Sequence, residues 1–223
     1  MLQIFKKYRI FFFTMLGFGI IFLTISYQLL NPKKSLPIMN PSDVNPEMVD
    51  STVQYKSKNH IIDDFSFTNQ NGKTITQKDY EGKIYVADFF FTTCQSICPK
   101  MTANLLDVQK AFLNNPKVML LSHSVTPDID NVAVLKKYAI EKGVVDSKWN
   151  LVTGDKKAIY GIARKSYLAV KTSSTAEMYD MVHTENFILV DTKKRIRGFY
   201  DGTKPDDIQK LITDINLLLT EEN

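Results

Sequence analysis

The feature that most constrains this chain is an uncharged segment near its amino terminus. Residues 10–30 contain no acidic or basic side chain. At about 1.5 Å per residue, a helix of this length spans roughly 30 Å, the thickness of a bilayer's hydrocarbon core. The segment is longer than the apolar region of a secretory signal peptide, and the residues after it lack a small-residue cleavage site. We therefore expect residues 1–30 to form a cytoplasmic tip and one uncleaved transmembrane helix.

Flanking charge predicts the orientation of this helix. Lys6, Lys7 and Arg9 precede the uncharged segment, whereas Lys33 and Lys34 follow it and are succeeded by acidic residues. Because positive charge is retained on the cytoplasmic side, we expect the amino terminus inside and the carboxyl-terminal domain outside.

Residues 31–58 contain four of the chain's eight prolines, interleaved with Asn, Ser and isolated charges. Such a composition favours an extended chain that forms no core of its own. We expect a flexible tether over 31–58, which joins the membrane helix to one folded domain at residues 59–223.

Charge and cysteine content exclude two classes of protein. The formal net charge is +4, but three basic residues precede the uncharged segment and the remainder of the chain is close to neutral. A nucleic-acid-binding protein has a concentrated basic face, so we predict no nucleic-acid partner. Only two cysteines occur, which excludes a small domain stabilised by several disulfides.

Beyond residue 58, apolar strands alternate with amphipathic segments. We expect buried strands at 84–91, 118–122 and 149–152, and a closing strand pair at 187–190 and 196–200. Helices are expected from about Pro99, at 131–142, at 155–166 and from Pro205 onward. Strands that alternate with helices, then a hairpin and a last helix, predict an α/β sandwich with a mostly parallel central sheet.

Two cysteines lie in the sequence TTCQSICPKM at residues 92–101. Cys94 and Cys98 occur where a core strand ends and a helix begins, which is the edge at which open α/β sheets bind ligands. A helix amino terminus favours the thiolate, so we expect both sulfurs to be reactive. The alternative is that both are small buried hydrophobic side chains, an ordinary role of free cysteine.

The spacing of the cysteines bears on what they bind. Positions i and i+4 of a helix hold their Cβ atoms about 5–6 Å apart, whereas a disulfide needs about 3.5–4.5 Å. A disulfide therefore requires local adjustment, and a metal ion bridges the wider gap more easily. Soft thiolates outside the cytoplasm favour Cu(I), although the geometry also admits zinc.

A trigonal ion held by two sulfurs needs one more ligand, and the chain has three histidines. His183 is the candidate for this third ligand, because it precedes a closing core strand, where a turn can face the cysteine loop. The ordinary alternative is a solvated or hydrogen-bonded imidazole. We expect His123 in a loop or near the ligands, and His60 at the surface.

Two further residues near the cysteines have alternative roles. Asp88 shares a strand face with Val86 and Phe90, so burial should raise its pKa unless it is paired. It could relay protons to and from the thiols, or be a buried acid satisfied by a lysine or a backbone amide. Met101 could offer a thioether ligand, but its place on the apolar stripe of the helix favours core packing.

Four stretches resemble, in order, the Sco/SenC family of membrane-anchored copper chaperones: FFFTTCQSICPKM, SVTPDIDNVAVLKKYA, WNLVTG and YDMVHTENFILVDTKKRIRGFYDGT. The resemblance implies a thioredoxin-like fold in which Cys94, Cys98 and His183 are the ligands of a copper ion. It also implies a single-pass protein of the bacterial inner (cytoplasmic) membrane, with its carboxyl-terminal domain in the periplasm or cell envelope. The implied task is assembly of cytochrome c oxidase, with the copper-site subunit of the oxidase as partner.

The sequence departs from related patterns in two places. Thioredoxin-like reductases usually have C-x-x-C and a cis-proline before the closing strand, but the spacing here is C-x-x-x-C and no proline lies between Met181 and Val190. Generic disulfide exchange is therefore less favoured. Thr126 precedes Pro127 where the family commonly has an acidic residue, so the resemblance supports no role for that loop.

Two functional hypotheses from different classes follow. In the first, the chain holds Cu(I) between two thiolates and one imidazole and passes it to the oxidase by stepwise ligand exchange. In the second, the chain is a membrane-anchored thiol-disulfide oxidoreductase in which Cys94 attacks and Cys98 resolves, which keeps the copper-site cysteines of the oxidase reduced. Whether the chain is an enzyme stays open, as does a sensor role, and a thiol reductant protein is a further candidate partner.

Overall fold

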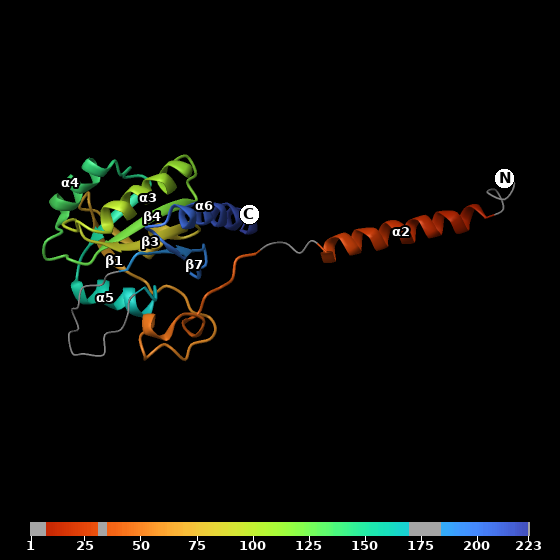
Figure 1. Ribbon diagram of the computed structural model, residues 1–223, viewed down its shortest axis with the longest axis horizontal. Helices are drawn as coiled ribbons and strands as arrows, with labels where there is room; N and C mark the ends of the chain where they lie inside the picture. Colours follow the sequence, from red (N-terminus) through yellow and green to blue (C-terminus); the bar gives the residue numbers. More distant parts are fainter. Residues whose placement is uncertain (1–7, 31–34, 170–183, 223) are drawn as a thin grey trace. The chain divides into compact units, whose positions relative to one another are not determined.

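The computed structural model describes residues 8–30, 35–169 and 184–222 (Figure 1). The chain divides into two compact units, Met1–Ser35 and Leu36–Asn223. The first unit contains the helix α2 (Arg9–Leu30), which is long and apolar enough to cross a bilayer. By length and composition, this helix agrees with the predicted membrane span.

The second unit is built on a sheet that has, within the described residues, seven strands in the order β2-β1-β5-β4-β3-β6-β7. The three central strands are parallel to one another, and the pairs on both sides of them are antiparallel. The strands are β1 (Ser66–Asn69), β2 (Thr74–Thr76), β3 (Ile84–Phe90), β4 (Val118–Ser124), β5 (Trp149–Thr153), β6 (Asn186–Val190) and β7 (Ile196–Asp201). The mostly parallel centre predicted from the sequence is thus formed by β5, β4 and β3.

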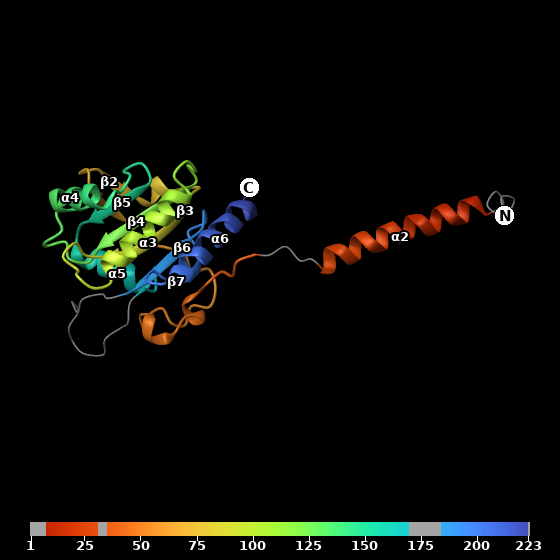
Figure 2. The same ribbon diagram turned by 45° about the horizontal axis from the view of Figure 1, so that its top comes forward.

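Helices cover both faces of this sheet (Figures 1 and 2). The helices are α3 (Cys98–Ala111), α4 (Val132–Lys142), α5 (Lys156–Lys165) and α6 (Pro205–Glu221). The side chains of α3, α4 and α6 share one apolar cluster with the sheet, and those of α5 share the cluster on the opposite face. The result is the predicted α/β sandwich, and the expected strands and helices agree with the observed ones to within two residues.

Local sequence signals explain where the elements begin and end. The Asn131 side chain accepts a hydrogen bond from the N–H of Val134 and caps the start of α4. Gly143 ends α4 in the left-handed conformation, at φ +77°, which glycine adopts without steric cost. The β1–β2 hairpin was not among the predicted strands, although Asn71 and Gly72 between the two strands are a strong hairpin signal, with Gly72 at φ +73°.

Residues 36–58 differ from the flexible tether expected there, because they pack on the folded domain. The N–H of Met39 donates to the carbonyl of Ile196 in β7 at 2.8 Å. Val49 and Val53 are buried in the apolar cluster that also contains α5. The prolines start two short 3-10 helices, Pro41–Asp43 and Pro46–Met48, rather than an extended chain. The compact unit therefore begins at Leu36 instead of residue 59.

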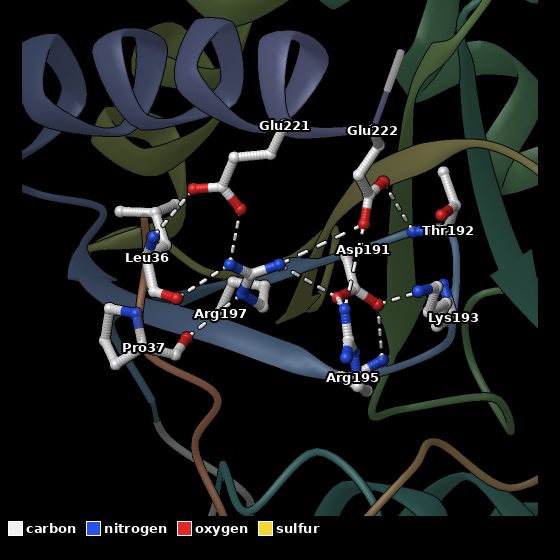
Figure 3. A network of polar contacts seen from close by, with 9 residues as sticks. All are labelled: Leu36, Pro37, Asp191, Thr192, Lys193, Arg195, Arg197, Glu221 and Glu222. Atoms are coloured by element: carbon white, nitrogen blue, oxygen red, sulfur yellow. Dashed lines mark hydrogen bonds and ion pairs between the residues drawn. The ribbon is translucent and has the colours of Figure 1, made fainter. Parts of the chain in front are cut away.

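A buried arginine holds the first residues of this unit in place (Figure 3). The guanidinium of Arg197, which is 4% exposed, donates to the carbonyls of Leu36 at 2.7 Å and Pro37 at 3.1 Å. It also pairs with Glu221 at 2.7 Å and with the fully buried Asp191 at 3.1 Å. These contacts, which we call the Arg197 network, join the start of the unit to β7 and to the end of α6.

Candidate functional site

The two cysteines lie at the edge where the parallel strands β3 and β4 end. Cys94 is in the loop after β3 and Cys98 is the first residue of α3, as the sequence predicts. Both are free thiols, with exposed fractions of only 8% and 4%. They belong to the apolar cluster that contains Phe90 and Met101, so most of the pair is shielded from water.

The loop brings the sulfur of Cys94 over the start of α3. Its Sγ accepts a hydrogen bond from the backbone N–H of Cys98 at 3.4 Å and lies 3.5 Å from the hydroxyl of Ser96. The N–H of Cys94 donates to the carbonyl of Phe91 at 3.3 Å, which closes a turn. Because the first N–H groups of a helix have no partner within the helix, this position favours a thiolate.

The two thiols have different acidities, whereas the sequence predicted that both would be activated. Burial raises the pKa of the Cys94 thiol, but hydrogen bonds from Ser96 and Cys98 outweigh burial and lower the pKa to about 7. Burial and the hydrogen bond to Cys94 raise the pKa of the Cys98 thiol to about 12. Near neutral pH, Cys94 is therefore the partly ionised sulfur and Cys98 keeps its proton.

Asp88 lies on β3, opposite Ser122 of β4, and is 3% exposed. The Ser122 hydroxyl donates to Asp88 Oδ1, and Ser122 in turn accepts from the indole N–H of Trp149 at 2.8 Å. Burial raises the pKa of Asp88 to about 7, against the weaker effect of the Ser122 hydrogen bond. The negative charge of Asp88 also contributes to the raised pKa of Cys98, so the two groups are electrostatically coupled.

The histidines are distributed differently from the sequence expectations. His60 was expected at the surface but is 5% exposed, with Nε2 2.7 Å from the carbonyl oxygen of Ser166. His123 was expected in a loop or near the ligands, but it is fully buried within β4 and its ring stacks on Phe89, on the sheet face opposite the cysteines. Burial lowers the pKa of His123 to about 3, so its imidazole is neutral. His183 lies outside the described residues.

Met101 is 1% exposed and packs in the core, as its position on the helix predicted. Within the described part of the chain, no group of three or more His, Cys, Asp or Glu side chains is arranged to hold a metal ion. The donors that the structure describes for a soft ion are thus the two sulfurs.

Asp130, a fully buried carboxylate beside the cysteine loop, was not among the predicted site residues. It accepts hydrogen bonds from the N–H and hydroxyl of Thr92 and from the hydroxyls of Ser124 and Thr126. The sequence did contain a signal for this site. Asp130 and several hydroxyl residues follow two core strands that lie next to each other in the sheet.

Comparisons with known proteins agree with this architecture. A family model described as SCO1/SenC matches residues 53–220. The SCO1 protein homolog of Bacillus subtilis (strain 168) is 32% identical over 159 residues, which cover 70% of this chain and 82% of that protein.

Two solved structures extend the comparison to three dimensions. BsSco, described as a member of the Sco family of cytochrome c oxidase assembly proteins with a disulfide switch, is 32% identical, with a TM-score of 0.62 over 73% of this chain and 95% of that one. ScoI of Bradyrhizobium japonicum, solved with copper bound, is 27% identical, with a TM-score of 0.57 over 71% of this chain and 99% of that one. These neighbours identify the fold as thioredoxin-like, and the chain belongs to the SCO1/SenC family.

Proposed function

We propose that this chain is a copper chaperone that binds Cu(I) through Cys94, Cys98 and His183. The protein delivers the ion to the copper-site subunit of cytochrome c oxidase during assembly of that enzyme. The observation that carries the proposal is the pair of free, shielded thiols at the sheet edge, with Cys94 Sγ 3.4 Å from the Cys98 N–H. Copper in the ScoI structure supports the choice of metal.

The chemistry of the donors suits a soft monovalent ion. Thiolate sulfur and neutral imidazole are ligands that Cu(I) accepts, and the apolar surroundings limit access of water and oxidants. With a pKa of about 7, Cys94 supplies the first thiolate near neutral pH. Cys98, with a pKa of about 12, must lose its proton when the ion binds, so loading releases protons to solvent.

Delivery requires that the bound ion can also dissociate from its ligands when it meets the target. In stepwise ligand exchange, a cysteine of the oxidase subunit displaces one ligand at a time, and each released thiolate of the chaperone can take up a proton. We propose that residues 1–30 anchor the chain in the bacterial inner membrane, with residues 36–223 on the periplasmic or envelope side. Such an anchor raises the local concentration of the donor near a membrane-bound target.

The test is copper binding by the full-length protein in detergent micelles. The reduced protein is loaded with Cu(I), and X-ray absorption identifies the sulfur and nitrogen donors. We expect two sulfurs and one nitrogen, and His183→Ala should lose the nitrogen and most of the affinity while both thiols remain titratable. His60→Gln is the matched control, because the His60 imidazole already contacts a backbone carbonyl. Unchanged copper retention in His183→Ala contradicts the proposed ligand set.

A second candidate function is thiol-disulfide exchange, which the unequal thiols favour. Cys94, with the lower pKa, would attack a disulfide of the oxidase subunit, and Cys98 would then resolve the mixed disulfide. The target disulfide gains two electrons and two protons, the pair becomes a disulfide, and a thiol reductant protein restores it. Asp88 would accept the proton of Cys98 during the second step. The disulfide switch named for BsSco supports redox chemistry in the family.

The two functions are separable by experiment. A Cys98→Ser variant should trap a mixed disulfide with the oxidase subunit if exchange occurs. Exchange that persists in His183→Ala favours the oxidoreductase, whereas copper transfer that is lost in His183→Ala favours the chaperone.

A further inference from the structure

A buried carboxylate holds the segment of chain that leads into Cys94. Asp130 is fully buried just before α4. Its Oδ2 accepts from the backbone N–H of Thr92 at 3.2 Å, and its Oδ1 accepts from the Thr92 hydroxyl. Thr92 is two residues before Cys94, so the carboxylate acts on the cysteine loop from outside it.

The peptide group between Phe91 and Thr92 connects this carboxylate to Cys94. Its N–H donates to Asp130, and its carbonyl accepts from the N–H of Cys94 at 3.3 Å. The sulfur of Cys94 in turn accepts from the backbone N–H of Cys98 at 3.4 Å. Movement of this one peptide group would therefore displace Cys94 relative to Cys98.

Asp130 is itself fixed to the neighbouring strand. Its Oδ2 accepts from the hydroxyls of Ser124 at 2.6 Å and Thr126 at 3.0 Å, at the end of β4. The backbone N–H of Asp130 donates to the carbonyl of Thr126 at 2.9 Å. The carboxylate thus ties the ends of β3 and β4 together, and Thr126 acquires a role that the family resemblance did not supply.

We propose that Asp130 is a positioning residue for the thiol pair. It holds the Phe91–Thr92 peptide so that the sulfur of Cys94 stays within reach of Cys98. The inference rests on the proposed function in taking these two thiols as the working groups. It concerns their spacing and not the metal, so it can be tested without copper.

Charge explains why an amide cannot replace this carboxylate. Both oxygens of Asp130 accept, and all four of its donors, two from Thr92 and one each from Ser124 and Thr126, point at them. Hydrogen bonds to an ionised acceptor are roughly twice as strong as neutral ones. In Asp130→Asn one oxygen becomes an NH₂ group that faces donors, and the Thr92 contacts are weakened without loss of side-chain volume.

The experiment measures how easily the metal-free, full-length protein closes a disulfide in detergent micelles. The protein is equilibrated with mixtures of reduced and oxidised glutathione. Cys94 and Cys98 each give up one electron and one proton and form an S–S bond, while one glutathione disulfide becomes two glutathione thiols. We expect Asp130→Asn to lower the equilibrium constant about tenfold, or about 30 mV, because a misplaced reacting group loses effective concentration.

Three further measurements make the result decisive. Asp128→Asn, an exposed acid in the same loop that pairs with Lys156, should leave the equilibrium constant unchanged. Thr92→Val replaces the hydroxyl with a methyl group and keeps the backbone N–H contact. It should lower the constant by a smaller factor, and it decides the question if Asp130→Asn does not fold. Urea unfolding of each variant separates stability from thiol spacing. A variant that loses stability but keeps the wild-type disulfide constant overturns the proposal.

Failure of the wild-type protein to bind copper would instead refute the proposed function and leave this result standing.

Discussion

Replacing Arg197 with methionine should detach the first residues of the folded unit. The substitution keeps an apolar chain of similar length but removes the guanidinium that contacts the carbonyls of Leu36 and Pro37 and pairs with Asp191 and Glu221 (Figure 3). Removing one partner of a buried ion pair typically costs about 3–5 kcal/mol, because a buried charge is left uncompensated.

The structure places the expected loss at the lower end of that range. Asp191 retains an ion pair with Arg195 at 2.7 Å and accepts the backbone N–H groups of Lys193 and Arg195 at 2.9 Å. Glu221, whose side chain is 19% exposed, can reach water. We therefore expect Arg197→Met to lower the free energy of unfolding by about 3 kcal/mol.

Urea unfolding of the full-length protein in micelles measures this loss, and hydrogen exchange locates it. Exchange should accelerate at the Met39 N–H, which bonds to Ile196 of β7. Lys137→Met is the control, because its ion pair with Glu141 is long, at 3.8 Å, and exposed. An Arg197→Met protein as stable as this control, with unchanged exchange at Met39, would refute the reasoning.

Three other predictions concern the acid, the thiols and the domain boundary. The pKa of Asp88 rises from 3.8 to about 7 on folding, so between pH 4 and pH 7 the folded state keeps a proton that the unfolded state loses. The free energy of unfolding should therefore fall as the pH rises from 4 to 7, by at most roughly 4 kcal/mol. Asp88→Asn should flatten that part of a urea-unfolding profile, and an unchanged slope contradicts the assignment. Iodoacetamide at pH 7 should modify Cys94 before Cys98, because the thiolate reacts and the pKa values are about 7 and about 12. If mass spectrometry finds the reverse order, Cys94 is not the more acidic thiol. A fragment that starts at Leu36 should be more stable than one that starts at Gln54 by at least roughly 2 kcal/mol, because the shorter fragment lacks the buried Val49 and Val53. Equal urea midpoints would show that residues 36–53 do not contribute to the stability of the domain.

Much of the fold followed from patterns between near neighbours in the chain. The apolar strand before Cys94, the proline-started helix at Cys98 and the caps at Asn131 and Gly143 each depend on residues within a few positions of one another. Hydrophobic period and capping chemistry are local properties, so the sequence by itself determined the order of strands and helices from β3 onward and the place of both cysteines among them.

Tertiary structure alone decided the properties that arise between distant residues. Arg197 meets Leu36 across 161 positions, and Asp130 meets Thr92 across 38. No local pattern encodes such contacts, because the folded sheet brings these positions together. The burial of His123 and the opposite pKa shifts of Cys94 and Cys98 have the same origin, since dielectric and hydrogen-bond environment depend on everything packed around a group.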